Sequence, residues 1–278
     1  MNSYTLSIVV CLYNSENHIE NLFNSLNKLN KSKIQIILVD DGSTDLTFSK
    51  ISNLELSDNM KIIHQKNMGL AGARNTGVNS CTSQWIALLD HDDKLTNEKI
   101  DFCNNFDENI NELNHYMFFA NAFIVNKFKE KNLKFYKDYF LLNHINLNKK
   151  EAYNNLLLKG CFIVSSTFFF NIDVFKKING FDEKLYFTCD YDFFLRATKL
   201  FDISYIDQPH CEWIEHENQS TKNLKYIHYK ELVLLYSREL KKFNNFNSKL
   251  LLIYVKLIRY RIKLFFLFFV NYGNRFKI

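Results

Sequence analysis

The sequence predicts an α/β fold in which helices flank a mostly parallel sheet, followed by a C-terminal amphipathic helical segment. Short β-branched apolar runs alternate with helix-period segments as far as about residue 93, which is the pattern of βαβ units. Residues 249–270 then place basic side chains at helical spacing among Leu, Ile and Phe. With 278 residues, of which 47% are hydrophobic, the chain can bury a full core.

The composition narrows the classes of partner. The formal charge of +5 comes from 35 basic and 30 acidic residues, so the strong basic excess of a nucleic-acid-binding protein is missing and no such partner is expected. The cysteines are scattered without a Cys-x-x-Cys pair, which argues against a disulfide framework or a zinc site and favours reduced thiols in the cytoplasm. The first apolar run is short and has no basic region before it, so we expect no secretory signal.

The first βα unit is predicted from a continuous apolar run. Residues 6–12 suit a strand that is buried on both faces. Asn14 or Ser15 is expected to cap the helix that follows. The buried stripe of that helix would consist of Ile19, Leu22, Phe23, Leu26 and Leu29.

Acidic clusters follow two of the later strands. Residues 34–39 predict a strand that ends in Asp-Asp-Gly-Ser-Thr-Asp, where Gly42 permits a tight turn. The helix after this turn could be capped by Ser43, Thr44 or Asp45. Residues 61–64 and 85–89 predict further strands, and the last one runs directly into the acidic residues 90–93. Ligand groups in such sheets gather at the carboxyl ends of strands, so both clusters are candidate site residues.

Beyond residue 95 the βα rhythm is lost. An Asn- and Lys-rich stretch surrounds residues 116–125, and residues 128–148 show no clear period, so we expect insertions here. Regular structure is expected to return with a strand over residues 161–170, a short helix over 173–178 and a helix from about 190 to 200.

Asp90 and Asp92 form the first candidate site. Two carboxylates with one residue between them at a strand end can bind Mn²⁺ or Mg²⁺, because these hard cations prefer oxygen ligands. A diphosphate would complete the coordination. The alternative is a solvated acidic turn that caps a helix beginning near Thr96.

Two further motifs suggest a nucleotide. Asp40 and Asp41 follow a strand, where a carboxylate can accept hydrogen bonds from a base or a ribose, although both could also cap a helix. Residues 67–77 carry three glycines and Arg74, which suits a close approach of the backbone and a fixed cation for phosphate. The alternative is helix packing by the glycines with Arg74 in a salt bridge. The segment lacks the Gly-x-Gly-x-x-Gly and P-loop patterns, which argues against redox dinucleotides and ATP hydrolysis.

Taken together, these motifs resemble a known family, the inverting glycosyltransferases of family two with the GT-A fold. The similarity to the nucleotide half of that family rests on residues 7–14, 39–45, 67–77 and 89–93, and the similarity to its acceptor half rests on residues 161–197. The resemblance spans roughly residues 5–220. It implies a GT-A-like nucleotide-sugar-binding half at residues 1–95 and an acceptor-binding half at 96–222. Beyond the resemblance, residues 223–278 are expected from their own pattern to form a helical, membrane-associated segment.

The resemblance also implies roles for single residues. Nucleotide contacts would come from Cys11, Tyr13, Asp41, Arg74 and Asp90, with Asp41 at the base and Asp90 at the ribose or the metal shell. Asp92 would bind Mn²⁺ or Mg²⁺, and His216 is a candidate second ligand, although a surface or capping histidine is the alternative.

The acceptor half would supply the catalytic base. Asp190 matches the acid that takes a proton from the acceptor hydroxyl in one inverting displacement. Asp182, Glu183 and Asp192 would bind the acceptor, whereas the alternatives are ordinary turn acids for the first two and stabilisation of a helix N-terminus for Asp192.

Three positions depart from the family pattern. Leu12 stands where Pro is frequent, Cys189 where a Glu usually precedes the base, and Ile214 where Arg is usual. The last two support the alternative of a catalytically silent glycan-binding or scaffolding subunit of the same fold. A nucleotidyltransferase would need a Gly-rich loop after the first strand, and residues 13–17 do not provide one.

The implied reaction is the metal-assisted transfer of a sugar from a nucleoside-diphosphate sugar, expected to be UDP-linked, to a hydroxyl of a glycan or lipid-linked acceptor. The implied setting is bacterial surface polysaccharide or lipooligosaccharide synthesis. In the C-terminal segment, Lys256, Arg259 and Lys263 recur at helical spacing, while the uninterrupted apolar part, residues 264–270, is far shorter than the ~20 residues that cross a bilayer. We therefore expect a basic amphipathic helix on the inner face of the cell membrane, with a packing helix as the alternative.

Overall fold

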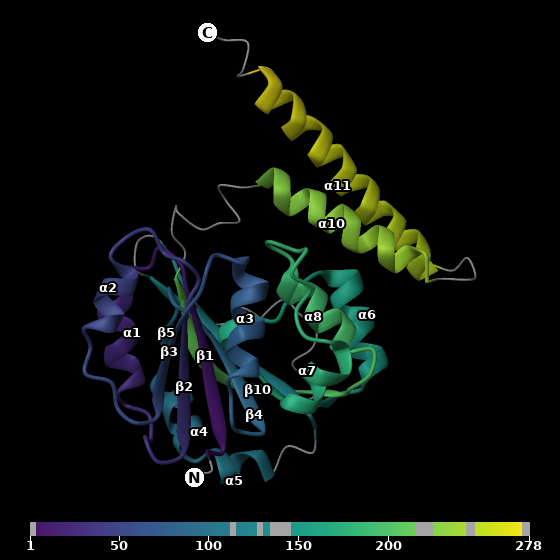
Figure 1. Ribbon diagram of the computed structural model, residues 1–278. Coiled ribbons are helices and arrows are strands. Elements are labelled where there is room, and N and C mark those ends of the chain that lie inside the picture. Colours follow the sequence, from purple (N-terminus) through teal and green to yellow (C-terminus); the bar gives the residue numbers. More distant parts are fainter. Residues whose placement is uncertain are drawn as a thin grey trace.

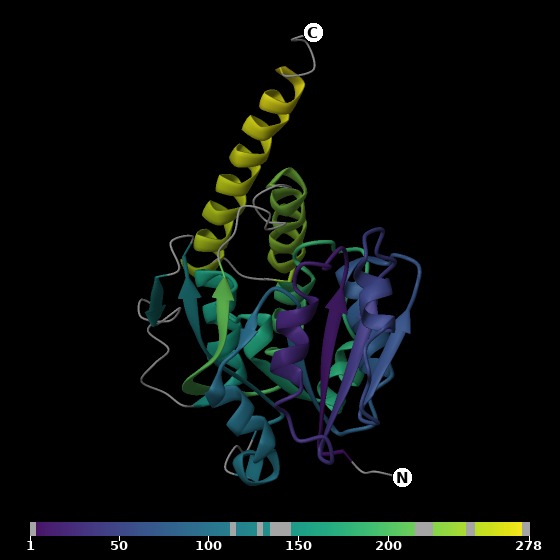
Figure 2. The same cartoon turned by 90° about the vertical axis from the view of Figure 1, so that its left-hand side faces the viewer.

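The computed structural model describes residues 4–111, 115–126, 130–133, 146–214, 225–242 and 248–273. These residues form an α/β fold in which one sheet lies between two layers of helices, as the sequence predicts (Figure 1). Two further helices lie beside the sheet domain, and the last one projects away from it toward the C-terminus (Figures 1 and 2).

The nucleotide half contains four parallel strands. They are β1 (Leu6–Leu12), β2 (Ile34–Asp40), β3 (Met60–His64) and β4 (Trp85–Asp90), in the spatial order β3-β2-β1-β4. This confirms the strands predicted from the apolar runs to within one residue at each end. Because the chain adds β2 and β3 on one side of β1 and β4 on the other, the sheet has a switch point at the carboxyl end of β1.

Alternate side chains of β1 divide the core into two faces. Leu6, Ile8, Val10 and Leu12 pack with the buried residues of α1 (Ile19–Leu26) and α2 (Thr47–Ser52). Val9 and Cys11 face the opposite layer, which contains α3 (Gly69–Asn79). The predicted stripe of the first helix is confirmed for Ile19, Leu22, Phe23 and Leu26, whereas Leu29 is buried but follows the end of α1.

α3 packs tightly against the sheet at Gly77. A Cβ atom at Gly77 would lie 2.4 Å from Cγ1 of Val9 and 3.3 Å from Cγ2 of Val39. At least Gly77 of the 67–77 segment therefore serves helix packing, which was the alternative to a close approach to phosphate. Gly42 is different: its φ of +70° requires a residue without a side chain, because a Cβ would meet the backbone nitrogen of Asn67 at 2.8 Å.

The helix caps differ from the predictions. α1 begins after His18, whose N–H donates to the carbonyl of Ser15, so neither Asn14 nor Ser15 is its cap. Asn14 instead adopts a left-handed conformation and its side chain accepts the N–H of Thr44 at 2.8 Å. The cap of α2 is Leu46, while Asp45 accepts the N–H of Thr47 at 2.9 Å. These polar side chains therefore tie two loops together beside the sheet rather than ending helices.

The second half of the chain completes the same sheet. β9 (Phe168–Asn171) pairs antiparallel with β4 and with β6 (Met117–Val125), and β6 pairs parallel with β10 (Ile203–Ile214). The short strands β5 (Lys94–Leu95), β7 (Lys131–Leu133) and β8 (Asn146–Leu147) pair at its margins. The sheet thus runs without interruption across the boundary expected near residue 95.

Two predictions for this half are wrong. Residues 116–125 are not part of an insertion, because β6 is an interior strand whose first six residues are buried. The strand expected over 161–170 is mostly replaced by a loop and the 3₁₀ turn η2 (Ser165–Thr167), and only β9 is extended. Aromatic packing fixes these strands, since the rings of Phe118 and Phe169 stack with centroids 4.5 Å apart. Most of the irregular stretch 128–148 lies outside the described residues.

Helices cover both faces of this half. They are α4 (Asn97–Asn104), α5 (Phe106–Asn111), α6 (Lys149–Lys159), α7 (Ile172–Ile178) and α8 (Cys189–Ala197). Thr96 caps α4 through its hydroxyl, which accepts the N–H of Lys99 at 3.1 Å. α7 and α8 agree with the predicted helices within three residues at each end.

α10 (Lys225–Leu240) and α11 (Ser248–Gly273) lie side by side (Figure 1). Ile253 and Leu257 of α11 are buried. Two of the three basic residues predicted for one side of α11 face α10. Nζ of Lys256 lies 5.6 Å from the ring centre of Tyr236, and Nζ of Lys263 lies 5.2 Å from the ring centre of Tyr229. Within the described ranges, no helix has the length and apolar content that a membrane span requires.

Candidate active site

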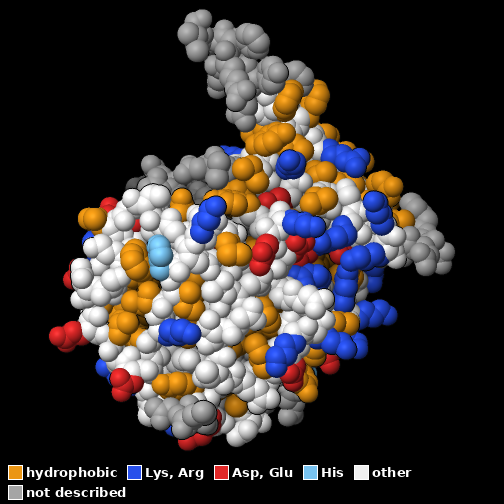
Figure 3. Space-filling view, viewed as in Figure 1, with side chains coloured by type: hydrophobic (Ala, Val, Ile, Leu, Met, Phe, Trp, Pro, Cys, Tyr) orange, Lys and Arg blue, Asp and Glu red, His pale blue; other side chains and the backbone are white. Residues whose placement is uncertain are grey.

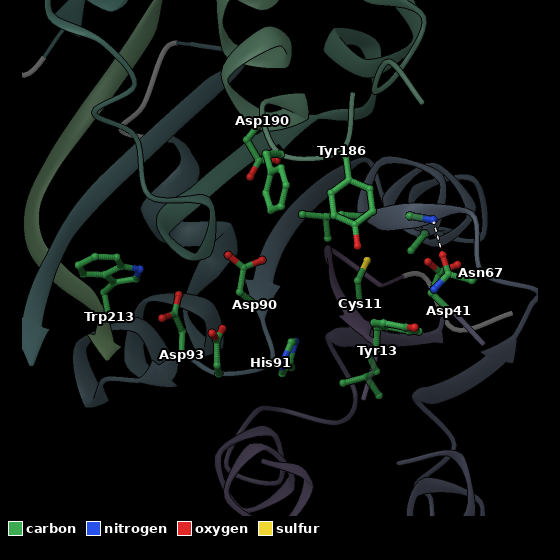
Figure 4. A pocket seen from close by; sticks show the side chains of 16 residues that line it. Cys11, Tyr13, Asp41, Asn67, Asp90, His91, Asp93, Tyr186, Asp190 and Trp213 are labelled. Carbon is green, nitrogen blue, oxygen red and sulfur yellow. Dashed lines mark hydrogen bonds between the residues drawn. The ribbon is translucent and has the colours of Figure 1, made fainter. Parts of the chain in front are cut away.

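A cavity of about 340 Å³ lies at the carboxyl ends of the parallel strands (Figure 4). The ends of β1, β2 and β4 contribute Cys11, Tyr13, Asp41 and residues 90–93, which are three aspartates and His91. Asn67 lies at the approach to α3, and Gly69 is its first residue. Tyr186 and Phe187 come from the segment before α8, Asp190 from the first turn of α8, and Trp213 from β10. The cavity therefore joins the two halves of the chain at the switch point of the sheet.

The cavity is elongated. Figure 4 shows Asp41 and Asn67 at one end, Asp93 and Trp213 at the other, and Asp90 between them. Asp190 lies on the side opposite His91 (Figure 4). The sequence-predicted residues Cys11, Tyr13, Asp41, Asp90, Asp92 and Asp190 all line this one cavity.

The side chains of Asp40 and Asp41 point to opposite sides, because successive side chains alternate along a strand. Asp41 lines the cavity, and its Oδ1 accepts the side-chain amide of Gln65 at 2.7 Å and the N–H of Met68 at 2.8 Å. Asp40 is fully buried elsewhere, with its Oδ2 2.6 Å from Nδ1 of His64. Of the two acids, only Asp41 is placed to meet a ligand in the cavity.

Arg74 lies behind the acids and not in the cavity. Its side chain is 2% exposed, its NH2 group donates to Oδ1 of Asp90 at 2.8 Å, and its NH1 group pairs with Asp190. Burial is the largest single effect and would lower the pKa of Arg74, but the charge and hydrogen bond of Asp90 together with its other neighbours outweigh it, and the pKa is raised. A direct nucleotide contact does not fit this position, and the salt-bridge alternative does.

Asp190 is held from two sides in the first turn of α8. Arg74 pairs with its Oδ1, and the hydroxyl of Ser165 donates to its Oδ2 at 2.6 Å. Cys189, which stands where the family usually has a Glu, is a buried thiol whose pKa is raised by burial and lowered in part by Arg74. The carboxylate of Asp190 is thus oriented without an acidic neighbour at position 189.

Asp93 adds a third carboxyl group to the acidic end of the cavity. Its Oδ2 accepts the hydroxyl of Ser166 at 2.5 Å, and the carbonyl of Ser166 accepts Nζ of the fully buried Lys99 at 2.5 Å. Burial, followed by the charges of Asp90 and Asp92, raises the pKa of Asp93 well above its usual range.

This crowding of carboxyl groups fits a divalent cation. Asp90, Asp92 and Asp93 offer only oxygen atoms, which are the ligands that Mg²⁺ and Mn²⁺ prefer, and a cation would relieve their mutual repulsion. The part of the chain that the structure describes holds no ready-made group of three or more His, Cys, Asp or Glu ligands. His216, the second predicted metal ligand, lies outside the described residues.

The three predicted acceptor residues lie away from this cavity. Asp192 has no exposed surface, and its carboxylate binds Nε of Arg196 at 2.7 Å and the guanidinium of Arg238. This buried, doubly paired position in the first turn of α8 fits the alternative, stabilisation of a helix N-terminus, better than acceptor binding. Asp182 and Glu183 line a separate surface depression, where Glu183 accepts the amide of Asn75 at 2.8 Å.

Sequence reasoning missed four residues that organise the site. Ser165 orients Asp190, and Ser166 orients Asp93. Lys99 donates to the carbonyl of Ser166, and Glu231 of α10 binds the segment before α8. The available signal for Glu231 was its position on the same helix face as Leu232, Leu235 and Tyr236, although Glu239 shares that face. The serines gave no signal, because their role depends on contacts with residues far away in the sequence.

Comparisons with known proteins agree with this geometry. The family model described as Glycosyl transferase family 2 matches residues 7–178, which is more than half of the chain. EpsH of Bacillus subtilis, whose name places it among glycosyltransferases, is 35% identical over 104 residues, and the match covers 37% of this chain. The chain spans only 29% of the length of that relative.

Two solved structures share the fold. Staphylococcus aureus TarS 1-349 in complex with UDP-GlcNAc matches with a TM-score of 0.68 and 20% identity, covering 93% of this chain and 73% of that one. The mannosyltransferase PcManGT of Pyrobaculum calidifontis, in complex with GDP-Man and Mn²⁺, matches with a TM-score of 0.62 and 14% identity, covering 92% and 69%. With the sequence motifs, the shared fold and the matching family model, the chain belongs to glycosyl transferase family 2.

Proposed function

We propose that this chain transfers a sugar from a nucleoside-diphosphate sugar to a hydroxyl group of a glycan or lipid-linked acceptor, with inversion at the anomeric carbon. One observation carries the proposal: Asp41, Asp90 and Asp190, which come from β2, β4 and α8, line a single cavity at the switch point of the sheet. This arrangement offers a nucleotide end, an acidic centre and a base within one site.

The nucleotide would lie toward Asp41. A carboxylate accepts hydrogen bonds only, so Asp41 suits the N–H group of a base such as uracil. Tyr13, which is 43% exposed, offers an aromatic face beside it. The likeness to a structure that holds UDP-GlcNAc supports a uridine-diphosphate sugar, although the fold is shared with one that holds GDP-Man.

The diphosphate would lie over the acids of β4. Asp92 and Asp90 would hold Mn²⁺ or Mg²⁺, with His216 as a further candidate ligand. When bound, this cation supplies positive charge that stabilises the departing nucleoside diphosphate. Asp93 and Ser166 hold the turn that carries these ligands.

Asp190 would act as the general base. Its carboxylate takes the proton of the acceptor hydroxyl while that oxygen attacks the anomeric carbon and the nucleoside diphosphate leaves from the opposite side. Arg74 and Ser165 orient the carboxylate, and Arg74 also ties it to Asp90 on the donor side. A single displacement of this kind inverts the anomeric centre.

α11 would hold the enzyme on the cytoplasmic face of a membrane. Its exposed side carries large apolar side chains at helical spacing, namely Leu251, Val255, Ile258, Ile262, Phe265 and Phe266. We call this set the apolar stripe. Arg259 and Arg261 flank the stripe on both sides, and apolar side chains also cover the surface of the projecting helix in Figure 3. Such a face binds an interface that contains anionic lipids, where lipid-linked acceptors are found.

Substitution of the base tests the proposal. In the Asp190→Asn variant the side chain keeps its size but cannot take the proton of the acceptor hydroxyl. We therefore expect turnover to fall by about 10²- to 10⁴-fold while the affinity for the donor stays within a few fold. Release of nucleoside diphosphate and donor binding by calorimetry measure the two quantities. Asp101→Asn, at an exposed position of α4, is the matched control and should behave as wild type. A wild-type protein that binds a nucleotide but never transfers or hydrolyses a sugar would favour the silent-subunit alternative.

A further inference from the structure

Glu231 of α10 makes an unusual set of contacts with the segment that precedes the catalytic helix. Its side chain is buried, and its carboxylate accepts the backbone N–H groups of Tyr186 at 2.6 Å, Phe187 at 2.9 Å and Thr188 at 2.9 Å. The hydroxyl of Thr188 adds a fourth hydrogen bond at 3.1 Å. One carboxylate from a distant part of the chain therefore binds three consecutive backbone donors.

The bound segment controls two features of the cavity. Tyr186 and Phe187 line the cavity wall, and Thr188 is the N-cap residue of α8, two positions before Asp190. The hydroxyl of Thr188 caps no N–H group of α8 and donates to Glu231 instead, so Glu231 adds negative charge beside Asp190 and Asp192 at the N-terminus of the helix. The position of the Asp190 backbone thus depends on a residue that has no contact with the cavity itself.

Two ion pairs of Arg238 also join α10 to α8 and to the turn before it. Arg238 lies seven residues after Glu231 on α10, and it pairs with Asp192 of α8 and with Asp182 in the turn before it. α10 therefore contacts α8 in two places. Glu231 binds the segment just before α8, and Arg238 binds Asp192 in the first turn of α8. The two contacts together fix the direction in which the first turn of α8 presents Asp190.

We propose that Glu231 is a positioning residue for sugar transfer, which holds residues 186–188 so that the carboxylate of Asp190 and the ring of Tyr186 meet the acceptor correctly. The inference rests on the proposed transferase function of the cavity. It assigns the C-terminal helix α10 to the catalytic unit, in addition to the membrane contact of α11.

The Glu231→Gln variant of the full-length protein tests the assignment. The amide keeps the size of the side chain but turns an N–H₂ group toward backbone donors, so the segment should lose its fixed position. We expect kcat to fall by about 10- to 100-fold, the loss that a misplaced catalytic group causes, while KM for the donor stays within threefold. Amide hydrogen exchange at residues 186–188 should become at least tenfold faster.

Glu239→Gln is the matched control. Glu239 is also a buried carboxylate on α10, but it contacts Lys199 at 2.6 Å and Tyr153 at 2.5 Å and not the cavity segment. Its substitution should lower the thermal stability without changing kcat or the exchange at 186–188. Assays are run well below the unfolding temperature of both variants.

The outcomes separate this inference from the function on which it rests. An active wild type with a Glu231→Gln variant whose kcat stays within twofold overturns the positioning role and leaves the proposed function intact. A kcat loss of the same size in Glu239→Gln also overturns it, because the effect would then be general to α10. If the wild type transfers no sugar, the proposed function fails. Unchanged amide exchange at residues 186–188 in Glu231→Gln would separately refute the claim that Glu231 holds this segment.

Discussion

At the scale of single residues, the site is organised by buried charges of alternating sign. Arg74 lies between Asp90 and Asp190, and Lys99 lies beneath the turn that holds Asp93. Each cation is almost fully buried, so each needs the carboxylates or carbonyls that surround it. The acids of the cavity thus keep a fixed geometry before any ligand binds, which is the condition for rapid chemistry in a preformed site.

His210 gives a prediction for pH dependence. It is fully buried on β10 beside Phe102, and burial, followed by the positive charge of Lys99, lowers its pKa well below 6.5. In the unfolded chain the imidazole binds a proton below pH 6.5 but in the folded protein it does not, so the folded state loses stability as the pH falls. The loss should approach about 1.4 kcal/mol per pH unit.

The His210→Leu variant should remove this contribution. We expect its free energy of unfolding to depend less on pH than that of wild type between pH 7 and pH 5, as measured by denaturant titration. Equal slopes for the two proteins over this range would contradict the assignment.

At the scale of elements, α3 shows how a helix brings a buried cation to a strand end. Gly77 lets the helix axis approach β1 and β2, and Arg74 on the same helix binds Asp90 at the end of β4. The same residues that resemble a phosphate-binding segment are thus used here for packing. The sequence could predict that residues 67–77 matter but could not decide between these two uses.

Gly77→Ala tests the packing of α3. The new Cβ would lie 2.4 Å from Val9, so β1 or α3 must shift and we expect a loss of about 1–3 kcal/mol in the free energy of unfolding. Asn79→Ala, at the exposed end of the same helix, should change it by less than about 0.5 kcal/mol. Similar values for the two variants in chemical denaturation would show that the close approach has no energetic weight.

The apolar stripe of α11 makes the second prediction at this scale. Ile258 is 50% exposed, and an acidic side chain at its place should weaken binding to vesicles that contain anionic lipid by roughly 10- to 100-fold. Flotation of the Ile258→Glu variant with such vesicles measures the change. Leu56→Glu, which makes the same charge change at a side chain that is 37% exposed in the loop before β3, should bind as wild type does. Equal flotation of both variants would refute a membrane contact through this stripe.

At the scale of the whole molecule, the sequence predicts the nucleotide half far better than the acceptor half. The strands β2 and β4 are mostly apolar runs that end in acids, so local pattern alone places Asp41 and Asp90 at one edge of the sheet. β6 escaped prediction because Asn121 interrupts its apolar run, and only the complete sheet buries that polar side chain.

The rest of the site depends on contacts between distant segments. The pairs Arg74–Asp190, Ser165–Asp190 and Glu231–Thr188 each join separate elements, so no local spacing could reveal them. For the same reason the sequence could name Asp190 through a family resemblance but could not say what holds it. The acceptor side remains least predictable, because Asp192 looked available in the sequence and is fully buried in the fold.

The most direct test of the account is a screen of the purified protein, with Mn²⁺ or Mg²⁺, against a panel of nucleotide sugars. Thermal stabilisation and release of nucleoside diphosphate are followed together, because a ligand that binds only the folded state raises the apparent stability. The account predicts a metal-dependent response to a uridine-diphosphate sugar that disappears in the Asp92→Ala variant. A folded protein that responds to none of the nucleotide sugars with either metal would contradict it.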